Sequence, residues 1–258
     1  MAAGAVEVNI TSPNARAGAK FDGVDDYIEV SEDSTLALGD VPQTISAWIK
    51  TDSSNGYIVG SRDTLQGGLS LFLSGGGAVQ PLIGINTNSS APGDLRDNLL
   101  HHIVIVYDTI DIKSYVDGIL KLTDNTLVGA FDSTVRRILG AKWLLEGLTT
   151  NIYFKGIMNN VQIFNIALTQ SEIETIYNNG KGLFNIVTSG LVAHFPLEKD
   201  YSTKVGDATL TNHGTHFGIF EEDIAAAVKA DRVTANDIYL IAETGNGKQA
   251  ITTIIEET

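Results

Sequence analysis

A cluster of carboxylates lies in residues 21–30, which read FDGVDDYIEV. Asp22, Asp25 and Asp26 surround one glycine, and clustered carboxylate and carbonyl oxygens are the ligands that calcium prefers. An Asp-Gly pair is equally typical of a tight turn, in which the carboxylates accept hydrogen bonds from nearby backbone N–H groups. The cluster therefore has two interpretations: a calcium site, or a polar turn that starts a strand.

Histidine supplies a second set of candidate metal ligands, led by the adjacent His101 and His102. Successive side chains of a strand point to opposite faces, so these two cannot hold one ion together. We expect one of them to be buried against a sheet and the other to lie near solvent. His213 and His216 flank a turn, but no Asp, Glu or His at metal-binding spacing accompanies them.

Aromatic side chains could bind a sugar, because a ring face stacks on the C–H bonds of the sugar ring. Trp48 falls in the middle of the alternating stretch 44–50 and is predicted to be a core residue. Trp143 falls in a predicted loop and is the stronger candidate for contact with a ligand. Weaker candidates, in or beside predicted loops, are Tyr57, Arg62 and Asn86.

Strands must position these side chains, because short alternating or apolar stretches dominate residues 17–165. Predicted strands cover residues 27–30, 44–50, 57–59, 69–73, 81–86, 101–107, 111–116, 119–122, 137–140 and 154–165. Asn-Gly at 55–56 and Asp-Gly at 117–118 are hairpin signals, and GGG at 75–77 reads as a hairpin tip. Turns about every eight to twelve residues indicate an all-β, two-sheet antiparallel sandwich.

One short helix is predicted over residues 168–177. Thr169 as N-cap and Glu172 three residues later form a capping box, and Asn-Asn-Gly at 178–180 is typical of a helix end. Ile173, Ile176 and Tyr177 share one face, which we expect to pack on the sandwich.

The tail has a different pattern, which predicts a small α+β extension. Residues 221–231 suggest a second short helix, and residues 237–243 and 249–255 flank a turn as in a hairpin. An isolated hairpin is barely stable in water, so the tail must dock on something. We therefore expect a homo-oligomer or a larger assembly.

Composition limits the classes of partner. The chain has 258 residues, 31 acidic and 17 basic side chains, and a formal net charge of −14. Phosphate backbones repel such a chain, which argues against nucleic acid as a partner. The absence of cysteine excludes disulfides and thiolate metal sites. No signal peptide is recognised, and no apolar run approaches the roughly 18 residues of a membrane span.

Six motifs in order resemble the laminin-G-like, concanavalin A-like jelly-roll domains of bacterial and phage proteins. They are AKFDGVDDYIEV at 19–30, TISAWIKTD at 44–52, LHHIVIVYD at 100–108, SYVDGILK at 114–121, ILGA at 138–141 and FKGIMNNVQIFNIALTQSEIETIYNNGKG at 154–182. The resemblance spans residues 17–184. It implies two antiparallel sheets, binding of glycans or proteins, and in some members calcium.

One departure from the family pattern concerns the order of the segments. The family's opening strand and turn resemble GLVAHFPL at 190–197 and NHGT at 212–215, which here follow the domain. Either this is a shortened second repeat, or strand 191–197 completes the sandwich as in a circular permutation, which we favour because an unpaired edge is a liability. Residues 5–11 compete for that edge. The predicted organisation is 1–16 arm, 17–184 sandwich, 185–218 completing strand and 219–258 docking segment.

The resemblance also bears on metal and catalysis. Family members carry a second acidic residue where this chain reads Met158-Asn159-Asn160, so a calcium site of Asp22, Asp25 and Asn159 has less charge than in its relatives. Glycosidases of this fold carry carboxylates at alternate positions of one strand, a spacing that no predicted strand shows, while Glu172 and Glu174 lie on the helix.

The expected function is therefore a non-catalytic binding module of a virion or bacterial cell surface that recognises glycans, such as a phage capsid decoration or tail adhesin. Two alternatives stay open. One is a purely structural assembly protein without a glycan ligand, and the other is a degenerate glycosidase. The partners would be glycans or other surface proteins, with calcium as a possible cofactor.

Overall fold

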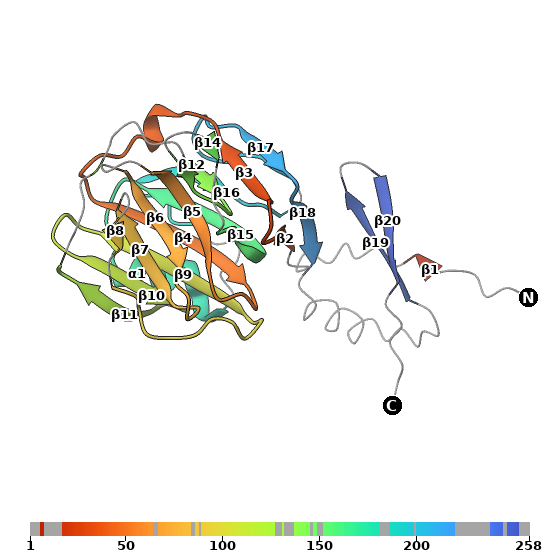
Figure 1. Cartoon of the computed structure of the whole chain (residues 1–258), viewed down its shortest axis with the longest axis horizontal. Coiled ribbons are helices and arrows are strands. Elements are labelled where there is room, and N and C mark those ends of the chain that lie inside the picture. Colours follow the sequence, from red (N-terminus) through yellow and green to blue (C-terminus); the bar gives the residue numbers. More distant parts are fainter. Residues whose placement is uncertain are drawn as a thin grey trace, which may run out of the picture.

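The computed structural model describes residues 6–7, 17–63, 67–83, 86–87, 89–126, 131, 137–144, 147–148, 152–180, 186–198, 200–219, 238–244 and 247–252. Within these residues the chain forms two large, mostly antiparallel sheets that stack face to face, one α-helix and a separate small sheet (Figure 1). The expected all-β sandwich of two sheets with one short helix is confirmed. Among the helices so described, none has the length and apolar character needed to cross a membrane.

We call the sheet that lies under the helix sheet 1. Its strand order is β11-β10-β9-β4-β15-β2-β18, and β16 also pairs with β15. The bounds are β2 Ala17–Asp22, β4 Gln43–Lys50, β9 Leu100–Tyr107, β10 Ile112–Val116, β11 Ile119–Asp124, β15 Lys155–Phe164, β16 Leu191–Phe195 and β18 His216–Ile219.

We call the opposite sheet sheet 2. Its order is β17-β3-β12-β5-β6-β7-β8, and β13 joins β5 and β14 beside it. The bounds are β3 Tyr27–Val30, β5 Gly56–Asp63, β6 Leu69–Leu73, β7 Val79–Ile83, β8 Asn86–Thr87, β12 Arg137–Leu139, β13 Trp143–Leu144, β14 Gly147–Leu148 and β17 Leu210–His213.

The main core lies between the two sheets and follows the alternation of the sequence. On β4, Ile45, Ala47 and Ile49 face this core, whereas Trp48 faces the outer side of sheet 1 and is 1% exposed. The prediction of Trp48 as a buried residue is confirmed. β6 likewise contributes Leu69, Leu71 and Leu73 to the core, which is the period that makes a strand amphipathic.

A helix covers the outer side of sheet 1. Helix α1 spans Gln170–Tyr177, with Thr169 and Glu172 forming the capping box and Asn178 closing it in the left-handed conformation. Ile173 and Ile176 are fully buried on a second apolar cluster that includes Val104, Val106 and Phe164. The 3₁₀ turns Ser34–Leu36 and Asn178–Gly180 complete the described helical elements.

Three strands that follow α1 in the chain, β16, β17 and β18, pair with strands that precede it. β16 pairs antiparallel with β15, from Val161↔Phe195 to Phe164↔Leu191. β17 pairs with β3 and β18 pairs with β2, so the turn 214–215 lies beside the turn 23–26. These strands carry core side chains, because Ala193 and Phe195 are fully buried.

The hairpin signals had different outcomes. Asp117 and Gly118, both with positive φ, close the β10–β11 hairpin, and residues 74–78 close the β6–β7 hairpin, as expected. The prediction of a hairpin at Asn55-Gly56 is wrong, because β4 belongs to sheet 1 and β5 to sheet 2. Gly56 instead allows a close crossing, since a Cβ there would lie 2.7 Å from the Cα of Phe154.

The tail and the N-terminal arm share a third sheet. β19 (Ile238–Thr244) and β20 (Gly247–Thr252) form the expected hairpin, and β1 (Val6–Glu7) pairs in parallel with β19. In the described residues the arm is therefore a neighbour of β19 and not an edge strand of the sandwich. The prediction that residues 5–11 compete for that edge is wrong. The helix expected at 221–231 lies outside the described residues, and docking of the tail stays a prediction.

The pairing of β16 predicts that residues 191–219 are integral to the stability of the sandwich. Phe195→Ala should lower the free energy of unfolding by about 3–5 kcal/mol, because it leaves a cavity in the core. Urea denaturation measures this, with Ile186→Ala, 39% exposed, as the control that should change it by less than about 0.5 kcal/mol. Equal, small effects for the two variants would contradict the structural role of β16.

Candidate functional site

The acidic turn connects sheet 1 to sheet 2 and uses its carboxylates locally. Asp22 Oδ1 accepts hydrogen bonds from the backbone N–H of Val24 (2.7 Å) and Asp25 (3.3 Å), and Asp26 Oδ2 accepts one from the N–H of Asp22 (2.9 Å). Burial acts to raise the pKa of Asp22, but the backbone N–H groups lower it overall. Asp22 is therefore an ionised cap of the turn.

Asp26 is held between the two neighbouring turns. It is 5% exposed, and a Cβ at Gly214 would collide with its carboxylate, so glycine is required there for close packing. Burial raises the pKa of Asp26, helped by the charges of Asp22 and Asp25, while His216 acts in the opposite direction. The carboxylate thus locks the turn at 23–26 to the turn at 214–215.

A cation would find three carboxylates here, whose ligand atoms lie within 4.8 Å of one another in Asp22, Asp25 and Asp26. Asn159 does not join them. Lys155 of β15 faces Asp22, and Asn159 lies four residues further along the strand, buried and opposite Trp48. The set Asp22, Asp25 and Asn159 is therefore wrong as one site, because the register separates its members. Two of the three clustered carboxylates already accept backbone N–H groups, which fits the turn, and calcium stays a prediction.

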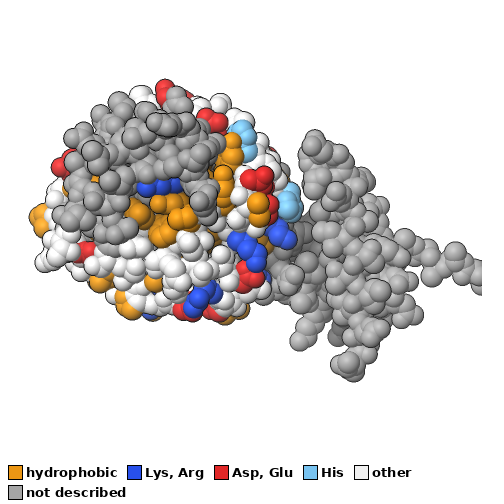
Figure 2. Space-filling model, viewed as in Figure 1, with side chains coloured by type: hydrophobic (Ala, Val, Ile, Leu, Met, Phe, Trp, Pro, Cys, Tyr) orange, Lys and Arg blue, Asp and Glu red, His pale blue; other side chains and the backbone are white. Residues whose placement is uncertain are grey.

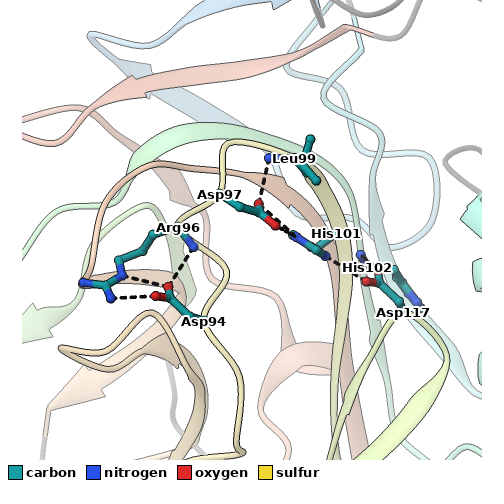
Figure 3. A network of polar contacts seen from close by, with 7 residues as sticks. All are labelled: Asp94, Arg96, Asp97, Leu99, His101, His102 and Asp117. Carbon is teal, nitrogen blue, oxygen red and sulfur yellow. Dashed lines mark hydrogen bonds and ion pairs between the residues drawn. The ribbon is translucent and has the colours of Figure 1, made fainter.

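A polar network lies at the start of β9 (Figure 3). His101 Nδ1 lies 2.8 Å from Asp117 Oδ2, and its Nε2 lies 3.2 Å from both carboxylate oxygens of Asp97. The other oxygen of Asp117 accepts the backbone N–H of His102 at 2.9 Å. The hydrogen bond that His101 donates to Asp117 raises the pKa of His101 despite partial burial, and Asp97 adds to the rise. The network ties the β10–β11 turn to the start of β9.

His102 points to the other side of the strand, as expected for adjacent residues. It is fully buried under α1, its Nε2 lies 2.9 Å from Ser46 Oγ, and its ring packs on Trp48 and Tyr177 at centroid distances of 5.0 and 6.1 Å. Burial lowers the pKa of His102 to about 3, so the ring is neutral at physiological pH. The prediction of one buried and one partly solvated histidine is confirmed, and both have structural partners.

Two of the ligand candidates chosen from the sequence are neighbours in the backbone, because Trp143 pairs with Arg62 in the β5–β13 ladder. Trp143 lies in β13 and not in a loop, Arg62 lies in β5 and Asn86 in β8, but their side chains lie outside the described part of the structure. Tyr57 is 6% exposed, with Phe72 at a ring-centroid distance of 4.7 Å and Lys142 Nζ 5.5 Å from its ring centre. The prediction that Tyr57 offers an open stacking surface is therefore wrong, because Tyr57 packs within the protein.

Two aromatic pairs lie on the outer face of sheet 2. Leu71 and Leu73 belong to the core, so Phe72 between them points outward, where it is half-buried against Tyr57. By the same alternation Tyr27 and Glu29 of β3 point outward, and the ring of Tyr27 stacks on His213 of β17 at 4.2 Å. Figure 2 shows hydrophobic side chains beside basic and histidine side chains on the face in view. We call Tyr27, Phe72 and His213, with their polar neighbours Glu29 and Gln80, the aromatic face.

Sequence reasoning missed the aromatic face, although the signal was present. Each of Tyr27 and Phe72 alternates with core residues in a strand, which fixes its direction. The sequence did not show which of the two sheets has its outer face covered by the helix. In sheet 1 the outward side chains lie under α1, whereas in sheet 2 Phe72 and Tyr27 stay partly accessible.

Comparisons with known proteins agree with this fold. The family model described as the concanavalin A-like lectin/glucanases superfamily matches residues 22–174. A search among curated proteins finds no match. A presumed carbohydrate-binding protein from Bacteroides ovatus superposes with a TM-score of 0.61 and 18% identity over 80% of this chain, which spans 60% of that protein.

A second similar structure is the heptameric, SAP-like pentraxin from Limulus polyphemus. It superposes with a TM-score of 0.56 and 16% identity, and the match covers 80% of this chain and 95% of the pentraxin. At such identities the two structures establish the fold and leave the ligand to be argued from this chain's own residues.

Removal of the Asp22 carboxylate should lower the stability of the protein by the same amount with and without calcium. Asp22→Ala should lower the free energy of unfolding by about 1 kcal/mol, because two backbone N–H groups lose their acceptor. Melting and urea curves recorded with calcium and with a chelator measure this loss. Asp25→Asn should leave both the melting midpoint and the free energy of unfolding unchanged. A chelator that lowers the midpoint of the wild type but not of Asp25→Asn would instead establish a cation site.

The His101 network predicts a pH-dependent contribution to stability. Because the folded pKa of His101 is raised above its unfolded value of about 6.5, the stabilisation is complete below that value and is lost as pH rises through the folded pKa. Asp117→Asn keeps an acceptor for the N–H of His102 but removes the charge. Its deficit in unfolding free energy should be larger at pH 5.5 than at pH 8.5.

The matched variant for this measurement is His101→Gln, which should abolish the same pH-dependent part. In the double variant the two pH-dependent losses should not add, because they belong to one interaction. A deficit of Asp117→Asn that is equal at both pH values would show that His101 is not the titrating partner.

Proposed function

The chain belongs to the concanavalin A-like lectin/glucanase superfamily, and on that premise we propose that it is a non-catalytic module that binds glycans through the aromatic face of sheet 2. The observation that carries the proposal is the pair of outward aromatic side chains, Phe72 and Tyr27, each fixed by a second ring. The central part of the outer side of sheet 1 is unavailable for this role, because α1 packs on it.

The aromatic face has the chemistry that a sugar requires. A pyranose ring presents C–H bonds to an aromatic ring and hydroxyl groups to polar side chains around it. Phe72 lies opposite Gln80 in the β6–β7 ladder, and Tyr27 lies next to Glu29, so each ring has a hydrogen-bonding side chain beside it. Because each ring already packs on a neighbour, little conformational entropy is lost when a ligand stacks on it.

The proposal of binding without catalysis is supported by the charges on this face. Hydrolysis of a glycosidic bond needs two carboxyl groups about 5–9.5 Å apart across the bond. Among the described outward positions of β3, β6, β7 and β17, Glu29 is the one carboxylate. In the acidic turn at residues 22–26, the carboxylates of Asp22 and Asp26 accept backbone hydrogen bonds.

The similar structures give limited support. The Bacteroides ovatus protein is presumed by its name to bind carbohydrate, and the heptameric pentraxin shows that this fold occurs in closed oligomers. An oligomer, a virion or bacterial surface location, and a role as capsid decoration or tail adhesin remain predictions from the sequence resemblance. A purely architectural role is the rival, in which residues 219–258 make the essential contacts.

The aromatic face predicts which substitutions abolish glycan binding. Phe72→Ala should weaken binding of a glycan identified on an array by about two- to tenfold, because one stacking contact is worth about 0.5–1.5 kcal/mol. Tyr27→Ala should act similarly if the ligand spans both pairs. Titration calorimetry or surface plasmon resonance measures the loss, and Ile119→Ala, exposed on β11 of sheet 1, is the matched control that should bind normally.

Two other outcomes would redirect the proposal. Loss of binding in Trp143→Ala with normal binding in Phe72→Ala would move the site to the position chosen from the sequence. Absence of binding to any glycan, together with loss of assembly when residues 219–258 are deleted, would establish the architectural role.

A further inference from the structure

Among the described residues, the side chain of Arg137 lies between the two sheets. Arg137 is the first residue of β12 and is 1% exposed, so its guanidinium group is inside the sandwich. Its Nη1 donates to the carbonyl oxygen of Leu69 on β6, and its Nη2 lies 3.4 Å from Oε1 of Gln43 on β4. Leu69 belongs to sheet 2 and Gln43 to sheet 1, so the side chain reaches from one sheet to the other.

The polar groups around Arg137 are neutral. Its described hydrogen-bond partners are a backbone carbonyl and an amide, and its neighbour across the β5–β12 ladder is Ser61. The hydroxyl of Ser61 is already paired with Ser70 Oγ at 2.8 Å and with the carbonyl of Gly68 at 2.9 Å. No carboxylate in the described part of the chain pairs with the guanidinium.

The guanidinium group keeps unused donors as well as an unpaired charge. Arginine has five N–H donors and stays protonated in proteins, and two of these donors are engaged here. The buried Nε has no acceptor. Burial lowers the pKa of Arg137 to about 10, with no opposing effect of an acidic group, so the side chain is still a cation at neutral pH.

A buried cation of this kind needs a partner with a negative charge. Buried charges in native proteins are paired or bound to ions, because a low-dielectric interior does not stabilise them. An ordered water could accept an N–H bond but could not neutralise the charge. We propose that Arg137 is the centre of an anion-binding site between the sheets, whose ligand presents a single carboxylate or an equally small monovalent anion.

The position of the site favours a ligand that enters from one end of the sandwich. Arg137, Leu69 and Gln43 are each the first residue of their strand, so their contact lies at one end of the two sheets and not at their centre. A carboxylate matches the planar fork of a guanidinium with two parallel hydrogen bonds. Its source is either an acidic sugar, which rests on the proposed glycan-binding function, or a free anion from the medium.

The overall charge of the chain makes this proposal testable. With a formal net charge of −14, the surface repels anions, so diffuse anion binding to exposed basic groups is a minor effect. A saturable response to an anion would therefore point to an internal site. General salt effects on stability act on any variant alike and are removed by comparison.

The experiment uses the full chain and two variants, Arg137→Met and Gln43→Glu. Arg137→Met removes the charge but keeps much of the apolar stem. Gln43→Glu is nearly isosteric and places a permanent carboxylate where the amide oxygen now faces Nη2. Thermal melting is followed in a zwitterionic buffer of low ionic strength with increasing sodium acetate, sodium chloride or N-acetylneuraminic acid, and with N-acetylglucosamine as the neutral sugar.

The wild-type midpoint should rise saturably, by about 3 to 6 °C once the anion exceeds its dissociation constant tenfold. Neither variant should show this rise, because one lacks the cation and the other carries its own counter-charge. A response to acetate and to the acidic sugar supports a glycan carboxylate as the ligand, and a response to acetate or chloride alone supports a structural anion. Equal responses of all three proteins would overturn the anion site.

Two further measurements keep the proposal independent of the rest. If Arg137→Met does not fold, anomalous scattering from a bromide-soaked crystal of the wild type decides, since bromide should lie within about 3.5 Å of the guanidinium and its absence there would refute the site. Loss of neutral-glycan binding in Phe72→Ala tests the aromatic face alone, so a failure of either proposal is recognised separately.

Discussion

The architecture depends on one constraint: the central strands of sheet 1 are buried on both of their faces. Every residue of β4 is buried, with Ile45 and Ile49 facing the core and Trp48 facing the opposite side. A sheet of this kind must be covered twice, and α1 provides the second cover through Ile173 and Ile176. Under the function that we propose, recognition by a sheet surface falls to sheet 2, where aromatic side chains such as Phe72 stay partly accessible.

The same constraint explains the value of the capping box and of the buried histidine. Thr169 and Glu172 fix where α1 begins, which places its apolar face over Val104 and Phe164. At the other end, Tyr177 packs over Trp48 and over His102, whose ring is neutral because it is buried. A protonated His102 would cost stability, so the cover of sheet 1 weakens as pH falls from about 6.5 towards the folded pKa of about 3.

Local signals were sufficient for most of the fold and insufficient for the site. The helix ends, the Asp117-Gly118 turn and the alternation around Trp48 depend on neighbours in sequence and were predictable. The Asn55-Gly56 signal fixes a local conformation but not the sheet to which the next strand belongs. Asn159 was misplaced because strand register, which sequence alone does not define, separates it from Asp22. Arg137 gave no signal at all, since its neutral partners among the described residues come from distant strands.

The pairing of β2 with β18 has a mechanical consequence. Ala17 and Ile219 face each other in this antiparallel pair, so the chain leaves the sandwich at two adjacent points on the same side. Tension between these two points would separate neighbouring strands from one end, and their hydrogen bonds would break one after another instead of sharing the load. The sandwich would therefore yield first by peeling β18 from β2, while the rest of the core resists.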